Sequence, residues 1–239
     1  MNRIRNFNKS ASQRGYSLIE LMISLGIGLF LLVGIAVIFL SNRATFITQG
    51  QLATLQNKEI MAMNIIGNVV QSAGYYINPH TQATIVALSA QTVTAPLAVN
   101  FAGGQAVFGG AVTGSDSIAV RAYQNNSLGA MDCTGNASRT DLVSSTFSVD
   151  TTNKNLQCSI NGADSQILVS GVSSMVLLYG VDVSATGSTT QYVTAENVKD
   201  WSKVMSVRVT LNFVNPMASQ AGQPATLAFT KVIGIMAQL

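Results

Sequence analysis

The stretch that decides the fold is Arg14-Gly15-Tyr16-Ser17-Leu18-Ile19-Glu20-Leu21, near the start of the 239-residue chain. It joins a short basic leader to residues 21–40, a run of 20 residues without a formal charge. A helix rises about 1.5 Å per residue, so this run is roughly 30 Å long, the thickness of the hydrocarbon core of a bilayer. The stretch therefore predicts a transmembrane helix with one carboxylate, Glu20, close to its beginning.

The cationic side chains of the chain are concentrated in this leader. The first 15 residues carry four of them and no acidic one, so the formal net charge of +3 becomes −1 when the leader is removed. The sequence pI of about 9.0 therefore belongs to the leader and does not indicate a nucleic-acid-binding surface. Basic residues before a span stay on the cytoplasmic side, which predicts that the C-terminal part lies across the membrane.

Glu20 has two interpretations from its residues alone. An acidic side chain inside an apolar helix is costly unless it is paired, so it can neutralise a positive charge such as an amine at a helix N-terminus. It can also be hydrated at the level of the lipid headgroups.

Gly15 has no side chain to obstruct a protease and permits an extended backbone. From hydropathy alone, an uncleaved signal anchor remains an equal alternative.

Residues 15–22, Gly-Tyr-Ser-Leu-Ile-Glu-Leu-Met, resemble the class III leader signal of type IV pilins and type II secretion pseudopilins. The resemblance implies that prepilin peptidase cuts between Gly15 and Tyr16 and methylates the new amine of Tyr16. It makes Glu20 the fifth mature residue, where the family has its glutamate, and implies that Glu20 pairs with the N-terminal amine of a neighbouring subunit. The family most often has Phe after the cut, so Tyr16 is a mild departure.

The rest of the chain predicts a longer helix followed by strands. Residues 41–72 contain no Pro and repeat apolar side chains at three- and four-residue steps, so the helix is expected to continue to about residue 73. The glycine-rich residues 103–110 are expected to be loop or hairpin, since no Gly-Lys-Ser/Thr follows them. Short β-type runs predict strands at 117–123, 146–149, 156–160, 166–169, 175–183, 191–193, 204–214 and 225–235.

Three further parts of the chain resemble PilW minor pilins: residues 26–43, residues 65–76, and segments within residues 177–209. The resemblance implies an α+β, pilin-like fold in which a long N-terminal helix packs on an antiparallel β-rich domain. The expected organisation is a leader (1–15), a transmembrane helix (16–40), an amphipathic continuation of that helix (41–74) and an extracytoplasmic β-rich domain (75–239).

Cys133 and Cys158 fall in the part predicted to be extracytoplasmic, where an even number of cysteines indicates a disulfide. Two thiols and His80 fall short of the four ligands of a zinc site, and residues 182–188 supply only one carboxylate for calcium. Neither a metal nor a cofactor is expected. Trp201, the only tryptophan, is expected to be a packing anchor, with a partner contact as the alternative.

No catalytic residues are expected, because the chain has one histidine and lacks the G-x-S-x-G and H-E-x-x-H motifs. The resemblance implies a minor pilin that helps to initiate or cap a type IV pilus. Its implied partners are other minor pilins, the major pilin, prepilin peptidase and the assembly platform in the inner membrane, without direct nucleic-acid binding.

The same resemblance implies a location. The precursor would cross the inner membrane once, with a cytoplasmic leader and a periplasmic domain, and would later lie in the filament at or near its tip. Two alternatives stay open: a minor pseudopilin of a type II secretion system, and a signal-anchored periplasmic binding module or enzyme.

Overall fold

The computed structural model describes residues 15, 17–124, 130–137 and 141–236. The chain divides into two units, Met1–Gly50 and Gln51–Leu239, and the helix α1 (Leu18–Gln71) has its first part in one unit and its last part in the other. α1 ends two residues before the end expected from the sequence. Gly74 follows with a φ of 81°, the left-handed conformation that glycine adopts most easily after a helix.

In the first unit, α1 presents apolar side chains on all sides. The large apolar residues between Leu18 and Leu40 are 56–80 % exposed. By length and composition α1 could cross a membrane, with a window of mean hydropathy 2.8 near the N-terminus and none of that window buried. A helix that is apolar all round is stable only where lipid or other apolar helices cover it.

In the second unit, the last part of α1 is amphipathic. Its buried residues recur at three- and four-residue steps and face the β-strands: Leu55, Ala62, Met63, Ile66, Val69 and Val70. Neighbouring apolar residues on the other face, Ile60 and Met61, are about half exposed. The pattern of exposed and buried residues thus changes along one helix, from apolar on all sides to amphipathic.

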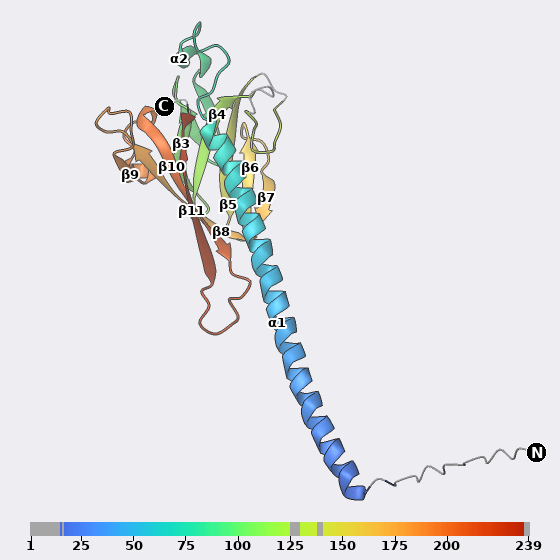
Figure 1. Cartoon of the computed structure of the whole chain (residues 1–239). Coiled ribbons are helices and arrows are strands. Elements are labelled where there is room, and N and C mark those ends of the chain that lie inside the picture. Colours follow the sequence, from blue (N-terminus) through green and yellow to red (C-terminus); the bar gives the residue numbers. More distant parts are fainter. Residues whose placement is uncertain (1–14, 16, 125–129, 138–140, 237–239) are drawn as a thin grey trace, which may run out of the picture. The chain divides into compact units, whose positions relative to one another are not determined.

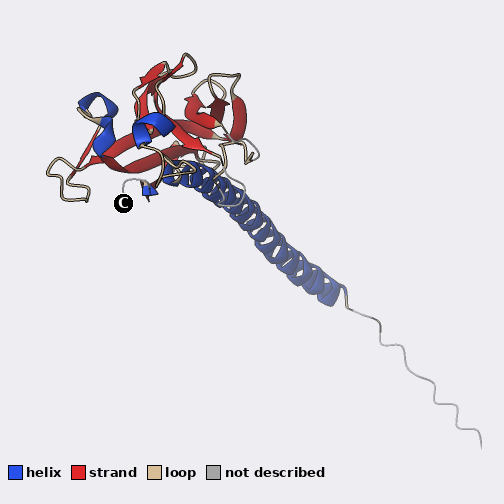
Figure 2. Cartoon of the chain, turned by 90° about the horizontal axis from the view of Figure 1, so that it is seen from above, coloured by secondary structure: helices blue, strands red, loops and turns tan. Residues whose placement is uncertain are grey.

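Every strand among the described residues lies in the second unit, and these strands form antiparallel sheets (Figures 1 and 2). One sheet has five strands in the order in which they occur in the chain: β3 (Val107–Val112), β4 (Ser115–Tyr123), β5 (Leu142–Asp150), β6 (Asn155–Ile160) and β7 (Gln166–Ser170). A second has four strands in the order β11 (Thr226–Gly234), β10 (Val204–Val214), β8 (Val172–Val181) and β9 (Gln191–Val193).

Smaller elements complete the unit. The two-stranded sheet pairs β1 (Gln91–Val93) with β2 (Val99–Phe101), after the four-residue helix α2 (Thr84–Ala87). Two 3-10 helices, η2 (Ala195–Asn197) and η3 (Trp201–Lys203), lie between β9 and β10. The α+β class, with a long helix packed on antiparallel sheets, is therefore confirmed.

The main core lies between the last part of α1 and the two large sheets. β10 shows the alternation expected from its sequence, because Val207, Val209 and Leu211 are fully buried while the residues between them are not. A second, smaller cluster joins β1 and β2 to the five-stranded sheet through residues such as Phe101 and Ala119. The part of the five-stranded sheet formed by β3 and β4 is thus covered on both faces.

The glycine-rich stretch contains a turn at Gly103 and Gly104 and the first strand of a hairpin, because β3 pairs with β4 across a turn at Thr113 and Gly114. Strands β1, β2 and β3 were not among the strands expected, and β3 includes Gly109 and Gly110. A Cβ atom at Gly109 would overlap the hydroxyl group of Tyr179, and one at Gly110 would lie 2.7 Å from Leu97 Cδ1. These glycines therefore allow two side chains to approach a strand closely, rather than providing a flexible loop.

Candidate functional site

The predicted processing site lies just before α1. Gly15 is exposed and outside any helix or strand, and α1 begins three residues later at Leu18. Tyr16 and residues 1–14 of the leader lie outside the described residues. The described part of the seam is therefore a short non-helical segment that leads into a helix, and Gly15 in it is accessible to another protein.

Glu20 lies in the first turn of α1 and is exposed. The first backbone N–H groups of a helix carry partial positive charge, so a carboxylate is favourable there. Large apolar side chains surround it in sequence, including Ile19 and Leu21, which are also exposed. Glu20 is thus one acidic group at the beginning of an apolar surface, open to contact with another chain.

The hydroxyl groups of α1 are compatible with an apolar environment. Ser24 Oγ donates a hydrogen bond to the carbonyl oxygen of Leu21 at 3.0 Å, and Thr45 and Thr48 donate to carbonyl oxygens four residues earlier at 3.0 Å. A polar group in lipid must find its partner within the protein, and these bonds supply one inside the helix.

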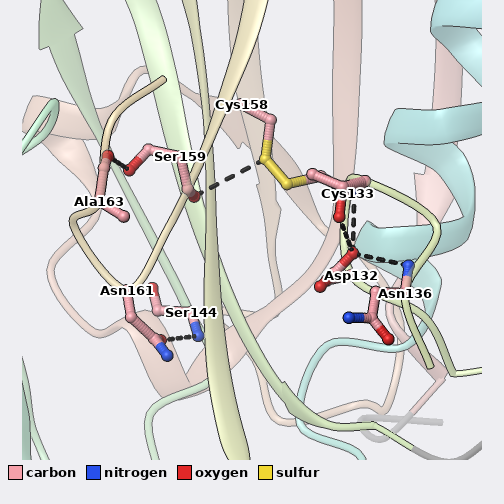
Figure 3. The surroundings of a disulfide bond; sticks show 9 residues. Asp132, Cys133, Asn136, Ser144, Cys158, Ser159, Asn161 and Ala163 are labelled. Atoms are coloured by element: carbon pink, nitrogen blue, oxygen red, sulfur yellow. Dashed lines mark hydrogen bonds between the residues drawn. A yellow bond between two sulfur atoms is a disulfide. The ribbon is translucent and has the colours of Figure 1, made fainter. Parts of the chain in front are cut away.

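Cys133 and Cys158 are joined by a disulfide with their Cα atoms 6.3 Å apart, and both are buried (Figure 3). Cys158 lies in β6, and Cys133 lies in a loop that the carboxylate of Asp132 organises. Asp132 Oδ1 accepts hydrogen bonds from the N–H groups of Thr134 and Asn136, both at 2.9 Å, and from the Thr134 hydroxyl at 2.7 Å. The disulfide fastens this folded loop to the five-stranded sheet.

Arg121, on β4, is a buried cation that the sequence analysis did not single out. Its guanidinium group donates hydrogen bonds to backbone carbonyl oxygens rather than to an acid, and its carbon Cζ lies 4.5 Å from the centre of the Phe101 ring. Burial lowers the pKa of Arg121 to about 10. The accepting carbonyl groups belong to Leu88, Ser89, Ala102 and Gln105.

Trp201 packs between two aromatic rings, as the packing interpretation expected. Its ring centre lies 5.0 Å from that of Phe108 and 4.9 Å from that of Tyr179, the latter in an edge-on arrangement. Tyr179 is fully buried, and burial raises the pKa of its hydroxyl group, with a further contribution from the charge of Asp116. This cluster joins η3 to β3 and β8.

Residues 182–188, which supply only one carboxylate for calcium, form a loop whose backbone binds that carboxylate. The Asp182 carboxylate accepts hydrogen bonds from the N–H groups of Ser184, Thr186 and Gly187 at 2.7–3.2 Å. These donors, together with the Thr186 hydroxyl, outweigh the effect of desolvation and lower the pKa of Asp182. Within the described residues, no group of three or more His, Cys, Asp or Glu side chains is placed to hold a metal ion.

Two family models match the chain. The prokaryotic N-terminal methylation motif matches residues 10–36, which contain the seam, Glu20 and the beginning of α1. The type IV pilus-assembly protein W model, PilW, matches residues 136–230, from just before β5 into β11. No curated protein matches the sequence of the chain.

Among solved structures, a type IV-like pilin from Thermus thermophilus is similar to the chain. The match has a TM-score of 0.42 and 10 % sequence identity, and it covers 76 % of this chain and 95 % of that one.

A methylation motif at the start of an exposed apolar helix, followed by a β-rich unit packed on the same helix, defines the class of type IV pilins. The PilW match within the β-rich unit narrows this class, and the two family matches together support a PilW-family type IV minor pilin. It is accordingly a structural, membrane-anchored protein that becomes part of a pilus.

Proposed function

We propose that this minor pilin helps to initiate or cap a type IV pilus after its leader has been removed. The observation that supports this most strongly is the position of the methylation motif, residues 10–36, over the start of an exposed apolar helix whose first turn contains Glu20. An apolar helix of this kind serves as a membrane anchor before assembly and as a packing surface in a filament afterwards.

Processing takes place between Gly15 and Tyr16, on the cytoplasmic side of the inner membrane. The exposed, non-helical Gly15 supports this position, because a protease needs an extended and unobstructed backbone at the bond that it cuts. Prepilin peptidase makes this cut and methylates the amine of Tyr16. The cut removes four cationic side chains, which otherwise hold the N-terminus at the cytoplasmic surface.

Glu20 pairs with the N-terminal amine of a neighbouring subunit as α1 leaves the bilayer. The amine exists only after the leader has been removed, so cleavage and assembly are coupled. An unpaired carboxylate in an apolar filament core would be unfavourable, whereas a pair of opposite charges offsets part of that cost. The pair would also set how far one helix lies along the other.

The β-rich unit makes the lateral contacts with other minor pilins and with the major pilin, and the assembly platform of the inner membrane moves the subunit into the filament. The position of this subunit is at or near the tip. With the leader removed, the side chains have a net charge of −1, which offers no electrostatic basis for direct nucleic-acid binding.

Mass spectrometry of the mature protein tests the processing step. We expect the N-terminal peptide to begin with N-methyl-Tyr16, and we expect the Gly15→Leu variant to keep its leader, because a large side chain next to the scissile bond obstructs the peptidase. Gly26→Leu serves as the matched control, since a Cβ atom at Gly26 meets open space and the residue lies away from the cut. An intact N-terminus in the wild-type protein, or a cut after residue 40, would contradict the proposal.

The PilW match favours a pilus over a type II secretion system as the site of action. Deletion of the gene separates the two roles. We expect loss of surface pili with normal secretion of folded enzymes, and complementation by the wild-type gene should restore the pili. Secretion that fails while pili remain would assign the chain to the secretion system.

A further inference from the structure

The two faces of the five-stranded sheet differ in polarity. On the face toward α1, β4 and β5 carry apolar side chains of the main core, such as Ile118 and Phe147. On the opposite face Ala119 pairs with Thr146, and Thr146 pairs with Ser159, so these three residues form one row. The polar side chains of β4, β5 and β6 that are fully buried are Ser117, Arg121, Ser144, Thr146 and Ser159. Such a polar face is normally in contact with water.

Residues 91–101, which form β1, β2 and the turn between them, lie over this polar face, and we call them the β1–β2 cover. A Cβ atom at Gly110 on β3 would lie 2.7 Å from Leu97 Cδ1, and one at Gly162, after β6, would lie 3.5 Å from Val93 Cγ1. The cover therefore extends from β3 to the end of β6. Its buried apolar side chains, which pack with Ala119, are Val93, Leu97, Val99 and Phe101.

The β1–β2 cover is attached at its base and not along its length. Arg121 donates hydrogen bonds to the carbonyl oxygens of Ser89 and Ala102, which lie on either side of the cover in the chain. Among the residues that the structure describes, no hydrogen bond joins residues 91–101 to the five-stranded sheet. Apolar packing alone thus holds the cover down, and the segments that Arg121 fixes can serve as its hinge.

The closed cover leaves hydroxyl groups without partners. The side-chain oxygens of Ser117, Ser144 and Thr146 make no hydrogen bond with any described residue. A buried hydroxyl group without a partner is unfavourable, whereas water can bond to it once the cover is lifted. The apolar side chains of the cover therefore favour the closed form and the hydroxyl groups favour the open form. These opposing contributions keep the free energy of opening below that of global unfolding.

We propose that the β1–β2 cover is a hinged lid that opens as a unit and exposes the hydroxyl-rich face while α1 and both large sheets stay folded. β1 and β2 form a sheet of their own, so no strand of the large sheets has to leave its partners when the lid opens. The protein then has two folded forms with different surfaces. The open form presents the hydroxyl groups of the sheet and the apolar underside of the cover, which the closed form hides.

Thiol labelling of the full-length chain, purified in detergent, measures the opening. Thr146→Cys places a thiol beneath the cover, and the two native cysteines are joined to each other, so only the introduced thiol reacts when no reductant is present. The matched control is Val120→Cys, because Val120 is 1 % exposed and belongs to the core on the opposite face. Both substitutions remove one methyl group. Ser144→Cys is a second probe beneath the cover and replaces Thr146→Cys if that variant loses the Trp201 fluorescence of the folded protein.

We expect the thiol of Thr146→Cys to react about ten-fold or more faster than that of Val120→Cys, because local opening needs less free energy than global unfolding. Its rate should hardly change in low concentrations of urea, since opening exposes little surface, whereas the rate for Val120→Cys should rise steeply.

A core substitution separates opening from unfolding. Met63→Ala creates a cavity between α1 and the sheets, which destabilises the closed and the open form equally. It should raise the labelling rate of Val120→Cys about ten-fold or more and change that of Thr146→Cys by less than about two-fold. Ile66→Val is a milder substitution in the same core, for use if Met63→Ala does not fold.

Equal labelling rates at the two positions, or an equal acceleration of both by the core substitution, would overturn the proposal, because the hydroxyl-rich face would then be exposed only by global unfolding. The measurement uses the purified chain alone. Its outcome is therefore independent of leader processing and of pilus assembly, and the two proposals can fail separately.

Discussion

At the scale of single residues, Arg121 shows how a buried charge can be held without an acid. Backbone carbonyl oxygens of Leu88, Ser89, Ala102 and Gln105 surround its guanidinium group, and each is a strong acceptor in a medium of low dielectric constant. The sequence could not reveal this role, because the partners are backbone atoms in loops. Glu20, in contrast, could be singled out from the sequence because an acid in an apolar run stands out by itself.

Replacing Arg121 tests its role in stability. In Arg121→Met the carbonyl groups lose their donors while the volume is nearly kept, so we expect the free energy of unfolding to fall by about 3 kcal/mol or more. Arg121→Lys keeps the charge but has three donors on one nitrogen, and we expect a smaller loss. Unfolding in urea, followed by the fluorescence of Trp201, gives both values, and Arg121→Met as stable as the wild type would contradict this assignment.

At the scale of elements, long or strongly alternating segments could be predicted, whereas of the three strands with three residues one was expected and two were not. The bounds of β9 and β10 agree with those expected from sequence, and α1 ends within two residues of its expected end. β1 and β2 have three residues each, too few for alternation to be recognised, whereas β9, which is as short, lies in a stretch that resembles PilW proteins. β3 was not among the expected strands because glycine is unfavourable in a strand, although the close approach of Tyr179 and Leu97 from distant segments requires Gly109 and Gly110.

The carboxylate before the 3-10 helix η3 makes a contribution to stability that depends on pH. Asp200 precedes η3 and accepts hydrogen bonds from the Ser202 hydroxyl at 2.6 Å and the Ser202 N–H at 3.0 Å. These bonds, with the charge of Lys203, lower the pKa of Asp200 in the folded state. A lowered pKa means that the ionised group stabilises the fold above its ordinary pKa, near 4, and that this contribution is lost as the pH falls through the folded value.

We therefore expect the wild-type protein to lose more stability than Asp200→Asn between pH 5 and pH 2, since asparagine still caps the helix but does not titrate. Asp200→Ala removes the cap as well, and should lower stability at pH 7 by about 1 kcal/mol. Thermal unfolding of the three proteins across this pH range is the measurement. Identical pH profiles for wild type and Asp200→Asn would show that the titration of Asp200 does not contribute.

At the scale of the whole molecule, one helix serves two environments. The sequence predicted this division from its hydropathy, because charges are absent from residues 21–40 and apolar residues recur periodically after them. It could not predict in the same way that Ile85 and Val86 are exposed, since their exposure depends on which face of a four-residue helix the fold covers. The Cys133–Cys158 disulfide was expected from the extracytoplasmic location and the even number of cysteines. The loop that Asp132 organises around Cys133 was not expected.

The role of Glu20 in assembly is tested in the whole molecule within cells. We expect Glu20→Gln to insert into the membrane and to be processed at Gly15 normally, because neither the apolar run nor the cleavage site changes. Incorporation into pili should fall about ten-fold or more, since the neutral amide cannot offset the charge of a neighbouring N-terminal amine in an apolar core. The control is Glu20→Asp, which keeps the charge on a shorter side chain and should retain part of the incorporation. Quantitative immunoblots of sheared pili and membranes provide the readout, and equal incorporation of Glu20→Gln and wild type would refute the charge pair while leaving the PilW assignment in place.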